Sequence, residues 1–489
     1  MPEFDLVIRN GTVVTASDIQ SCDVGVRGGK IVALAERLGA AAREIDATGR
    51  LVLPGGIDSH CHIDQPSSSG ARTADDFRSG TISAAFGGNT TIIPFACQYR
   101  GDSLREVVAD YHRRAEGKPV IDYAFHLIVT DPTPQTLGQD LPALIRDGYT
   151  SLKVYMTYER LKIDDFQMLE VLALARREGA LVMVHAENHD IIRWLGGKLL
   201  EAGHTAPKFH AIAHDRLAER DASQRAITLA EIVGVPLLIV HVSGSEAADQ
   251  IRWAQGQGLR IYGETCTQYL VLSDDGLDKE EWDGAMHVCT PPPRDKANQE
   301  AIWRGLATGV FQVVSSDHAP FRYDDPQGKL LNGKGAPFNK IPPGIPGLEV
   351  RLPILFSEGV GGGRIDLNQF VALSATNHAK IYGLYPRKGT IAVGSDADIA
   401  IWDPDKDVTI SVDMLHDNMD YTPYQGMRVR GWPVVTISRG EVVVEDGKLV
   451  AEPGRGAFLR CESLPSPGRP GAARSPFDPV TGNYQPANR

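Results

Sequence analysis

Eight short apolar runs, separated by amphipathic segments, recur along the middle of the chain. Runs of about four to eight residues are typical of buried strands, and strands that alternate with helices form a parallel sheet. Eight is the number of strands that closes such a sheet into a barrel. We therefore expect a (β/α)8 barrel of class α/β, with strands at residues 57–60, 90–94, 123–129, 151–155, 181–185, 237–241, 260–264 and 313–317.

Two of the intervening segments carry clear helix boundaries. Asp164 and Asp165 precede a helical repeat of apolar residues, and Gly179 follows it. Acidic residues complement the positive end of the helix dipole, and glycine adopts the left-handed conformation that ends many helices. Ser245 likewise precedes a segment that ends near Gly256. We predict helices there, and the first has an apolar repeat made of Phe166, Leu169, Leu172 and Ala173.

The two ends of the chain share a texture of short strands and turns that the middle lacks. Four dipeptides there supply the positive φ of tight hairpin turns: Asn10-Gly11, Gly28-Gly29, Arg439-Gly440 and Asp446-Gly447. We expect residues 1–53 and 386–460 to form one β-sandwich, attached to a catalytic barrel of residues 54–385.

Composition and charge narrow the class of protein. The 489-residue chain has a net charge of −12, which argues against nucleic acid or an anionic membrane as a partner. Its apolar stretches are far shorter than the ~20 residues that span a membrane, and we see no secretory signal. Six cysteines without paired spacing are typical of reduced thiols, so we expect a cytoplasmic protein. Residues 461–489 are rich in Pro and Gly, and we expect a tail that is disordered or lies on a neighbouring subunit.

Five polar side chains fall at the ends of predicted strands. His60 and His62 end the first strand, His185 the fifth, His241 the sixth and Asp317 the eighth. Catalytic groups of (β/α)8 enzymes lie at these ends, and residues two apart on a strand point to the same side. One such histidine alone is more often a hydrogen-bonded structural residue. Five such groups at one end of a barrel predict a metal site.

Lys153 lies inside the apolar fourth run. A buried ammonium group is unfavourable unless it is paired, so one interpretation is a salt-bridged structural lysine. The other is a neutral amine that has reacted with CO₂. The resulting carbamate has two oxygens that can bridge two metal ions, and a dry site that lowers the lysine pKa favours it.

The chain resembles the dihydropyrimidinase/hydantoinase group of cyclic amidohydrolases over residues 4 to about 460. The matching stretches are residues 54–64, 151–158, 184–188, 240–243, 264–270 and 315–320. The resemblance implies two divalent metal ions, usually zinc, held by His60, His62, Lys153, His185, His241 and Asp317. Lys153 would be N6-carboxylysine and bridge the ions, and Asp317 would accept and return a proton.

The resemblance also implies the groups that bind a small cyclic amide substrate. Tyr158 stands where the family has a tyrosine that donates a hydrogen bond to the developing oxyanion. Thr290 and Pro343 stand where the family commonly has serine and asparagine and binds the ring largely through main-chain groups. Proline keeps the carbonyl acceptor but has no N–H, so the ring contact survives at Pro343 if it uses the carbonyl.

The residues at a few positions help to distinguish this activity from those of related families. Dihydroorotases usually have arginine two residues after the second histidine, where this chain has Asp64. Hydrolysis of another cyclic imide or ureide, allantoin included, is the alternative activity, and a non-catalytic assembly protein of the same fold is a remote one. Assembly proteins of this fold have lost metal ligands, whereas this chain keeps all six, so we expect an enzyme. The resemblance implies a homotetramer.

The loops after the first and fourth predicted strands bear on substrate choice. Gln65 and Lys162 stand where hydantoinases that take bulky apolar substituents often have apolar residues, and Arg72 lies nearby. Polar walls gain little from burying a phenyl group, so we expect unsubstituted or polar-substituted rings to be preferred. In the alternative, these three side chains face solvent and the pocket is lined by Tyr155, Leu161 and Phe95.

Overall fold

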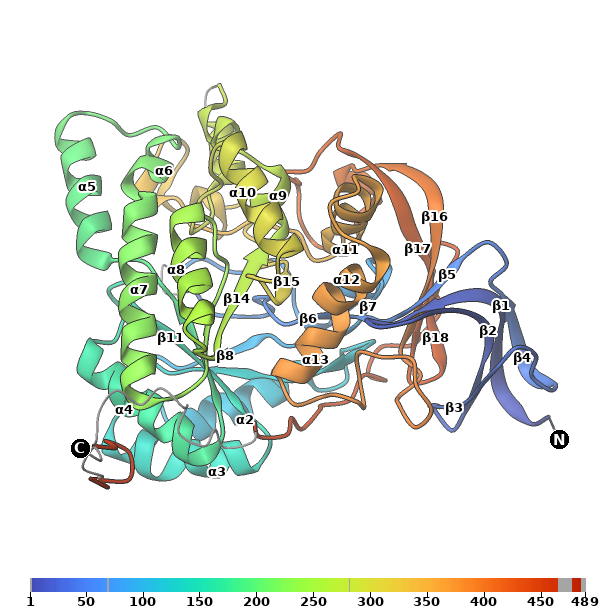
Figure 1. Ribbon diagram of the computed structural model, residues 1–489. Coiled ribbons are helices and arrows are strands. Elements are labelled where there is room, and N and C mark those ends of the chain that lie inside the picture. The colour runs from blue at the N-terminus through green and yellow to red at the C-terminus, as the bar shows by residue number, and fades with distance from the viewer. Residues whose placement is uncertain (1, 68–69, 281, 465–476, 485–489) are drawn as a thin grey trace.

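Ten strands form the barrel in the computed structural model, which describes residues 2–67, 70–280, 282–464 and 477–484 (Figure 1). They are β6 (Gly56–Asp58), β7 (Asn89–Ile92), β8 (Phe95–Cys97), β9 (Asp122–Tyr123), β10 (His126–Ile128), β11 (Ser151–Tyr155), β12 (Leu181–His185), β13 (Leu237–Ile239), β14 (Ile261–Cys266) and β15 (Val313–Ser315). Neighbouring strands pair in parallel, in the orders β6-β7-β9 and β8-β10-β11-β12-β13-β14-β15.

All eight predicted strand positions are confirmed. The second predicted strand corresponds to β7, and β8 follows it as an additional piece, whereas the third predicted strand appears as two pieces, β9 and β10. The first break lies at Pro94, which has no N–H to donate to the ladder. A parallel bridge between Cys61 and His318 joins the first and eighth positions and closes the barrel. The predicted (β/α)8 class is therefore correct.

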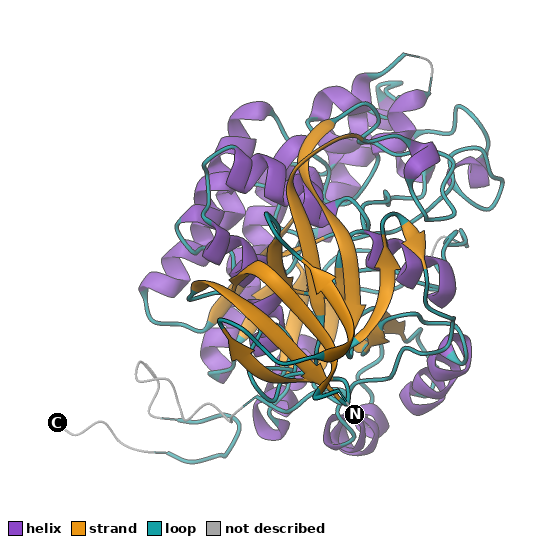
Figure 2. Ribbon diagram, turned by 90° about the vertical axis from the view of Figure 1, so that its right-hand side faces the viewer, coloured by secondary structure: helices purple, strands orange, loops and turns teal. Residues whose placement is uncertain are grey.

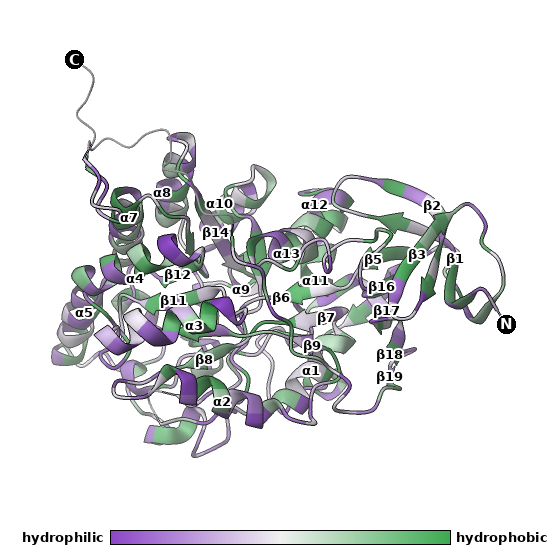
Figure 3. Ribbon diagram, turned by 90° about the horizontal axis from the view of Figure 1, so that it is seen from below, coloured by the Kyte–Doolittle hydropathy of each residue, from purple (hydrophilic) through white to green (hydrophobic). Residues whose placement is uncertain are grey.

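Helices cover the outside of the barrel (Figure 1). Their bounds are α1 (Phe77–Phe86), α2 (Leu104–Ala115), α3 (Leu141–Arg146), α4 (Asp165–Glu178), α5 (His189–Glu201), α6 (Phe209–Ala213), α7 (Arg216–Val233), α8 (Ser245–Gly256), α9 (Thr267–Val271), α10 (Lys296–Ala307), α11 (Arg351–Ile354), α12 (Leu367–Val371) and α13 (Asn377–Ile381). Hydrophilic and hydrophobic residues alternate along outer helices such as α2 and α3 (Figure 3). The hydrophobic sides of these helices pack on the strands, as in other α/β proteins.

Short 3-10 and π-helical turns complete the connections. They are η1 (Thr136–Asp140), η2 (Asp274–Asp278), η3 (Asp283–His287), η4 (Lys329–Asn332), η5 (Phe338–Lys340), η6 (Leu355–Gly361), η7 (Ala372–Thr376) and η8 (Val412–Met414). Of these, η4 and η5 lie in the long connection that follows β15, and both border the functional site described below.

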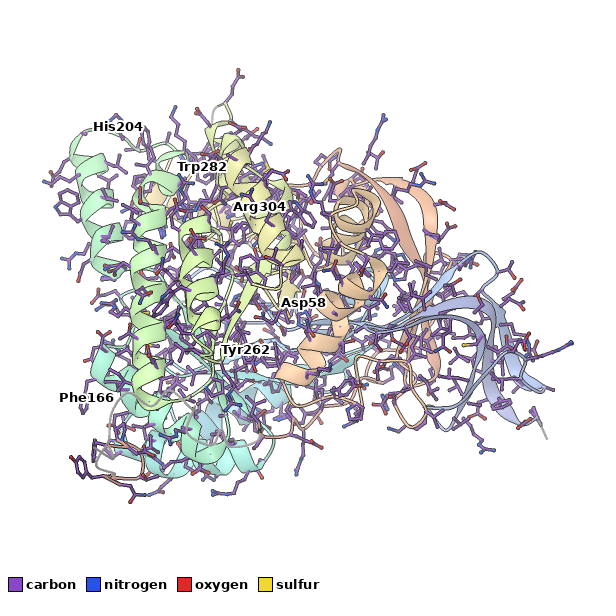
Figure 4. All side chains as sticks on the ribbon, in the orientation of Figure 1. Asp58, Phe166, His204, Tyr262, Trp282 and Arg304 are labelled. Carbon is purple, nitrogen blue, oxygen red and sulfur yellow. The ribbon has the colours of Figure 1, made fainter. Side chains whose placement is uncertain are left out.

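The boundaries of α4 agree with the sequence prediction. The Asp164 side chain caps the helix and Gln167 completes a capping box, while Gly179 ends it in the left-handed region at φ 75°. Phe166 differs, because it is 72% exposed and points outward in Figure 4, whereas we predicted it within the apolar repeat. Little of the described chain covers this ring, and the buried face of α4 is formed instead by Met168, Val171, Leu172, Leu174 and Ala175. Helix α8 has Gly244, not Ser245, at its N-cap.

The two chain ends meet in a separate sheet beside the barrel, as predicted (Figures 1 and 2). Its strands are β1 (Phe4–Val14), β2 (Ile19–Arg27), β3 (Lys30–Ala35), β4 (Ala41–Asp46), β5 (Leu51–Pro54), β16 (Ile399–Thr409), β17 (Arg428–Ser438), β18 (Glu441–Glu445) and β19 (Lys448–Leu449). On one edge, β1 pairs first with β4 and then with β5, so the sheet divides there into two parts. Apolar side chains from both chain ends share one core.

One predicted turn is wrong. Asn10-Gly11 does not turn a hairpin but forms an irregularity inside the continuous strand β1, with Asn10 at φ 60°. The Asn10 N–H donates to the carboxylate of Asp23 on the neighbouring strand, and this contact takes the place of the ladder bond. The dipeptides Gly28-Gly29, Arg439-Gly440 and Asp446-Gly447 do connect antiparallel strands, as predicted.

The last described segment contacts this chain's own barrel. Both terminal guanidinium nitrogens of Arg176 on α4 donate to the Asp478 carboxylate, at 2.8 and 2.9 Å. Much of the predicted tail, residues 465–476 and 485–489, lies outside the described residues. Within the described part of the chain, no helix is both long and apolar enough to cross a membrane.

Candidate metal centre

The predicted site residues gather at the C-terminal ends of the barrel strands. Lys153 is in the middle of β11, and His185 is the last residue of β12. His60, His241 and Asp317 each lie two residues beyond a strand rather than in it, which corrects the predicted strand ends. The last two have left-handed backbones, with φ of 40° and 50°, and such strained conformations occur often at functional sites.

One group of possible ligand atoms comes from the first and the last strand positions of the barrel. The Nε2 atoms of His60 and His62 lie 3.2 and 3.1 Å from Oδ1 of Asp317. The Lys153 Nζ lies 2.8 Å from the His60 Nε2 and 4.4 Å from the centre of the Phe95 ring. The three residues that could hold an ion here are thus already in contact, and the lysine reaches the same point.

A second group lies next to the first. The His241 Nε2 is 2.8 Å from the His185 Nδ1, and the His241 ring centre is 5.3 Å from that of His60. Both histidines are almost completely buried. The four histidines, Lys153 and Asp317 that the sequence singled out therefore form one continuous cluster.

Three further side chains orient the histidine rings. Glu264 Oε1 lies 2.6 Å from the His60 Nδ1, and Glu187 Oε2 lies 2.7 Å from the His185 Nε2. Gln65 Oε1 lies 2.8 Å from the His62 Nδ1. Sequence reasoning gave these three no such role. The available signals were a carboxylate at the end of the seventh apolar run and another two residues after His185.

These contacts fix the tautomers and point to a bound cation. Each ring donates its N–H outward to Glu264, Glu187 or Gln65, so its other nitrogen faces the cluster as a lone pair. The inward nitrogens of His60 and His62 then converge on one carboxylate oxygen of Asp317, at 3.2 and 3.1 Å. A ring nitrogen and a carboxylate oxygen this close are favourable only with a shared proton or a metal cation between them. The nitrogen and oxygen donors present suit a divalent ion such as zinc.

Electrostatics favour the ligand forms of these groups. Burial lowers the pKa of His60, His185 and His241, which keeps the imidazoles neutral. Burial opposes ionisation of Asp317, but the adjacent His60 and His62 outweigh it and lower its pKa to about 2. Burial also lowers the pKa of Lys153, which increases its neutral amine form.

A cavity of about 700 Å³ borders the cluster. Tyr158, Thr290 and Pro343 line it together with the predicted ligands His62, Lys153, His185, His241 and Asp317. Burial raises the pKa of the Tyr158 phenol well above its usual value, so the hydroxyl stays protonated and can donate. Tyr158 has a left-handed backbone, with φ 65°, at the start of the loop after β11.

The loop residues singled out for substrate choice divide between the two interpretations. Gln65 lines the cavity, although its amide oxygen is held by His62, whereas Arg72 and Lys162 are not among the lining residues. Tyr155 and Leu161 do line it, as in the alternative interpretation. Phe95 instead packs beneath the cluster, with its ring centre 4.9 Å from that of His60.

A closed parallel barrel with four histidines, an aspartate and a buried lysine at its C-terminal end is an arrangement that suits a metal-dependent hydrolase. Residues 51–443 match the model of the amidohydrolase family, and the chain belongs to that family. It is 46% identical over 457 residues to the D-hydantoinase of Geobacillus stearothermophilus, which covers 93% of this chain and 96% of that protein. It is 44% identical over 458 residues to the D-hydantoinase of Rhizobium radiobacter, at 94% and 99% coverage.

The solved structures agree with the sequence comparison. The dihydropyrimidinase of Brevibacillus agri superposes with a TM-score of 0.91 at 45% identity, and the match covers 94% of this chain and 99% of that one. Similarity of this extent includes both the barrel and the sheet formed by the chain ends.

Proposed function

We propose that this enzyme opens the C–N amide bond of cyclic ureides, such as dihydropyrimidines and 5-substituted hydantoins. The observation that carries the proposal is the cluster itself, in which two adjacent ligand groups border a cavity of about 700 Å³. The D-hydantoinase relatives, similar over nearly the whole chain, support this substrate class.

The site fits two divalent metal ions, which we propose to be zinc. His60, His62 and Asp317 would hold one ion, and His185 with His241 the other. Lys153 would lie between them as N6-carboxylysine, formed when its neutral amine attacks CO₂, makes an N–C bond and loses a proton. When bound, the ions supply activation of water at neutral pH and polarisation of the amide carbonyl.

The protein's own groups account for proton transfer and orientation. The Asp317 carboxylate, ionised at neutral pH, can accept the proton of the attacking water and give it to the leaving nitrogen. The protonated Tyr158 hydroxyl can donate to the oxygen on which negative charge develops, and one such donor stabilises a transition state by about 3 kcal/mol. Main-chain groups at Thr290 and Pro343 would hold the ring.

Two other functions can be distinguished from the proposed one. Another cyclic imide or ureide, allantoin included, would use the same groups. A non-catalytic assembly protein would not need Glu264, Glu187 and Gln65 to fix the histidine tautomers, so their positions favour catalysis. From the family resemblance we also propose that the enzyme is cytoplasmic and forms a homotetramer. Sedimentation of the purified enzyme would measure the number of subunits.

The deciding experiment is a ring-opening assay with dihydrouracil, hydantoin, succinimide and allantoin, together with the metal content of the purified protein. We expect turnover of the first two and about two metal ions per chain. Turnover of allantoin or succinimide alone would identify the alternative substrate class. Neither metal nor turnover would indicate the assembly protein.

A further inference from the structure

Two proline-rich segments form one wall of the cavity. The first, residues 288–293, reads Val-Cys-Thr-Pro-Pro-Pro, and the second, residues 341–344, reads Ile-Pro-Pro-Gly. Thr290 of the first and Pro343 of the second both line the cavity. Proline has no N–H, so both segments are rich in carbonyl acceptors and poor in donors. They cannot be held side by side by a regular ladder of backbone hydrogen bonds.

A buried lysine supplies donors to both segments. Nζ of Lys329, in η4, donates to the Val288 carbonyl at 2.9 Å and to the Pro342 carbonyl at 2.8 Å. The Gly344 N–H donates to the same Val288 carbonyl at 2.9 Å. The Val288 contact lies two residues before Thr290, and the Pro342 contact lies one residue before Pro343. The Lys329 amino group thus joins the two segments next to the residues that face the cavity.

The position of Lys329 is itself fixed. Its side chain is completely buried, and its N–H donates to the Arg322 carbonyl at 2.8 Å. A Cβ at the preceding Gly328 would meet that carbonyl oxygen at 2.2 Å, so only glycine allows this close approach. Among the ion pairs of the described residues, none involves Lys329. Burial lowers the pKa of Lys329 to about 7, and the amino group keeps N–H donors in both its forms. A buried polar group without a carboxylate partner is unfavourable, which indicates a specific use for these donors.

We propose that Lys329 is a positioning residue for substrate binding: it sets the distance between the main-chain groups of Thr290 and Pro343 that hold the ring. The inference rests on the proposed function, since it requires a cyclic ureide in this cavity. Lys329 touches neither the predicted metal ligands nor the reacting bond. Its loss should therefore weaken binding of the ring in the ground state and the transition state alike, which raises KM and leaves kcat nearly unchanged.

The test compares Lys329→Met, which keeps the length but loses the donors, with Lys329→Gln, which keeps two N–H donors without the charge. For hydantoin we expect KM to rise at least tenfold in Lys329→Met and by a smaller factor in Lys329→Gln. In both variants kcat should stay within threefold of the parent and the metal content should be unchanged. Lys334→Met, an exposed lysine of the same loop that does not line the cavity, is the matched control.

The possible results separate the two proposals. A KM within twofold of the parent in a folded, metal-containing Lys329→Met enzyme would overturn the positioning role and leave the proposed function intact. A parent enzyme that opens no cyclic ureide would overturn both. Failure of both variants to fold, measured by circular dichroism, would also count against the inference, because a positioning residue is not needed for the fold.

Discussion

Lys153 shows how the sequence of a single strand can place reactive chemistry. Its neighbours on β11 are apolar and buried, and its Nζ lies above the Phe95 ring beside a histidine nitrogen. No carboxylate forms an ion pair with this lysine among the described residues. A surrounding of this kind favours the neutral amine, the form that reacts with CO₂.

Lys153→Ala should lose most bound metal and at least about 100-fold in rate, because the bridging anion between the two proposed ions disappears. Metal content by mass spectrometry and kcat for hydantoin measure the two effects. Adding a short carboxylic acid should restore part of the rate. Lys448→Ala, on the exposed end of the separate sheet, is the control. Full metal and full rate in Lys153→Ala would exclude the carbamate.

Asp317→Asn should keep the fold and reduce kcat by about 10²- to 10⁴-fold, since an amide cannot accept the proton of the attacking water. Its metal content should fall less than that of a variant without His60 and His62. The exposed carboxylate of Asp324 lies in the same loop, and Asp324→Asn is the control. A kcat for Asp317→Asn within tenfold of the parent would remove Asp317 from the proton-transfer role.

At the scale of elements, local sequence signals were correct where neighbours along the chain decide the structure. Asp164 and Gly179 bound α4 because capping uses groups within a few residues. The signal of Asn10-Gly11 was equally strong but failed, because Asp23 on the next strand satisfies the Asn10 N–H. A turn dipeptide predicts its own backbone angles, but it does not predict which group accepts the hydrogen bond of its N–H.

Asp164→Ala should lower the free energy of unfolding by about 1 kcal/mol, since the first turn of α4 loses its side-chain cap. Asp164→Asn keeps an oxygen acceptor and should stay within a few tenths of the parent. Urea unfolding followed by circular dichroism measures both variants. Equal stability of Asp164→Ala and the parent would show that the rest of the barrel, not the cap, holds this helix end.

The residues of the candidate site also differ in whether the local sequence could predict them. The four histidines and Asp317 were found from the sequence because each stands at or near the end of an apolar run, and Lys153 because it lies inside one; both are local patterns. Glu264 was not, because its contact with His60 joins residues 204 positions apart. Lys329 was missed for the same reason. Which distant side chain orients a ligand depends on how the barrel closes, and no periodicity of the sequence carries that information.

At the scale of the whole molecule, a buried ion cluster joins the barrel to the separate sheet. Lys388 Nζ lies 2.7 Å from Asp122 at the base of the barrel and 3.1 Å from Asp396, and it also donates to Asp398 next to β16. The lysine and the three carboxylates are all buried. Asp122 further pairs with Arg439 in the turn after β17.

Lys388→Met should destabilise the protein by about 3–5 kcal/mol, because Asp398 loses its cation while buried, and Asp122 and Asp396 each lose one of their cations. KM for the cyclic substrate should not change, since the cluster lies away from the cavity lining. Thermal unfolding and steady-state kinetics provide the two measurements. Lys406→Met, an exposed lysine of β16, is the control. An unchanged transition temperature would show that the cluster contributes nothing to holding the two parts together.

Charge is distributed unevenly over the molecule. The chain has a net charge of −12, yet Asp317 is the one acidic residue among those of the described chain that line the cavity. Three exposed cations, Arg160, Arg193 and Lys340, lie among the lining residues. These three positive side chains attract anions to the cavity, although the net charge of the whole protein is negative. We therefore expect a carboxylate on the substituent of the ring to favour binding.

The rate constant kcat/KM should be higher for hydantoin-5-acetate than for 5-phenyl- or 5-benzylhydantoin. Raising the ionic strength from about 0.01 to 0.15 M should lower this value for the acetate and leave it unchanged for unsubstituted hydantoin, because salt screens exposed charges. Arg193→Gln should raise KM for the acetate about threefold and have no effect on hydantoin, which is the matched neutral substrate. A tenfold preference for the aromatic substrates would contradict the expectation, and would assign substrate choice to the apolar wall that Tyr155 and Leu161 provide.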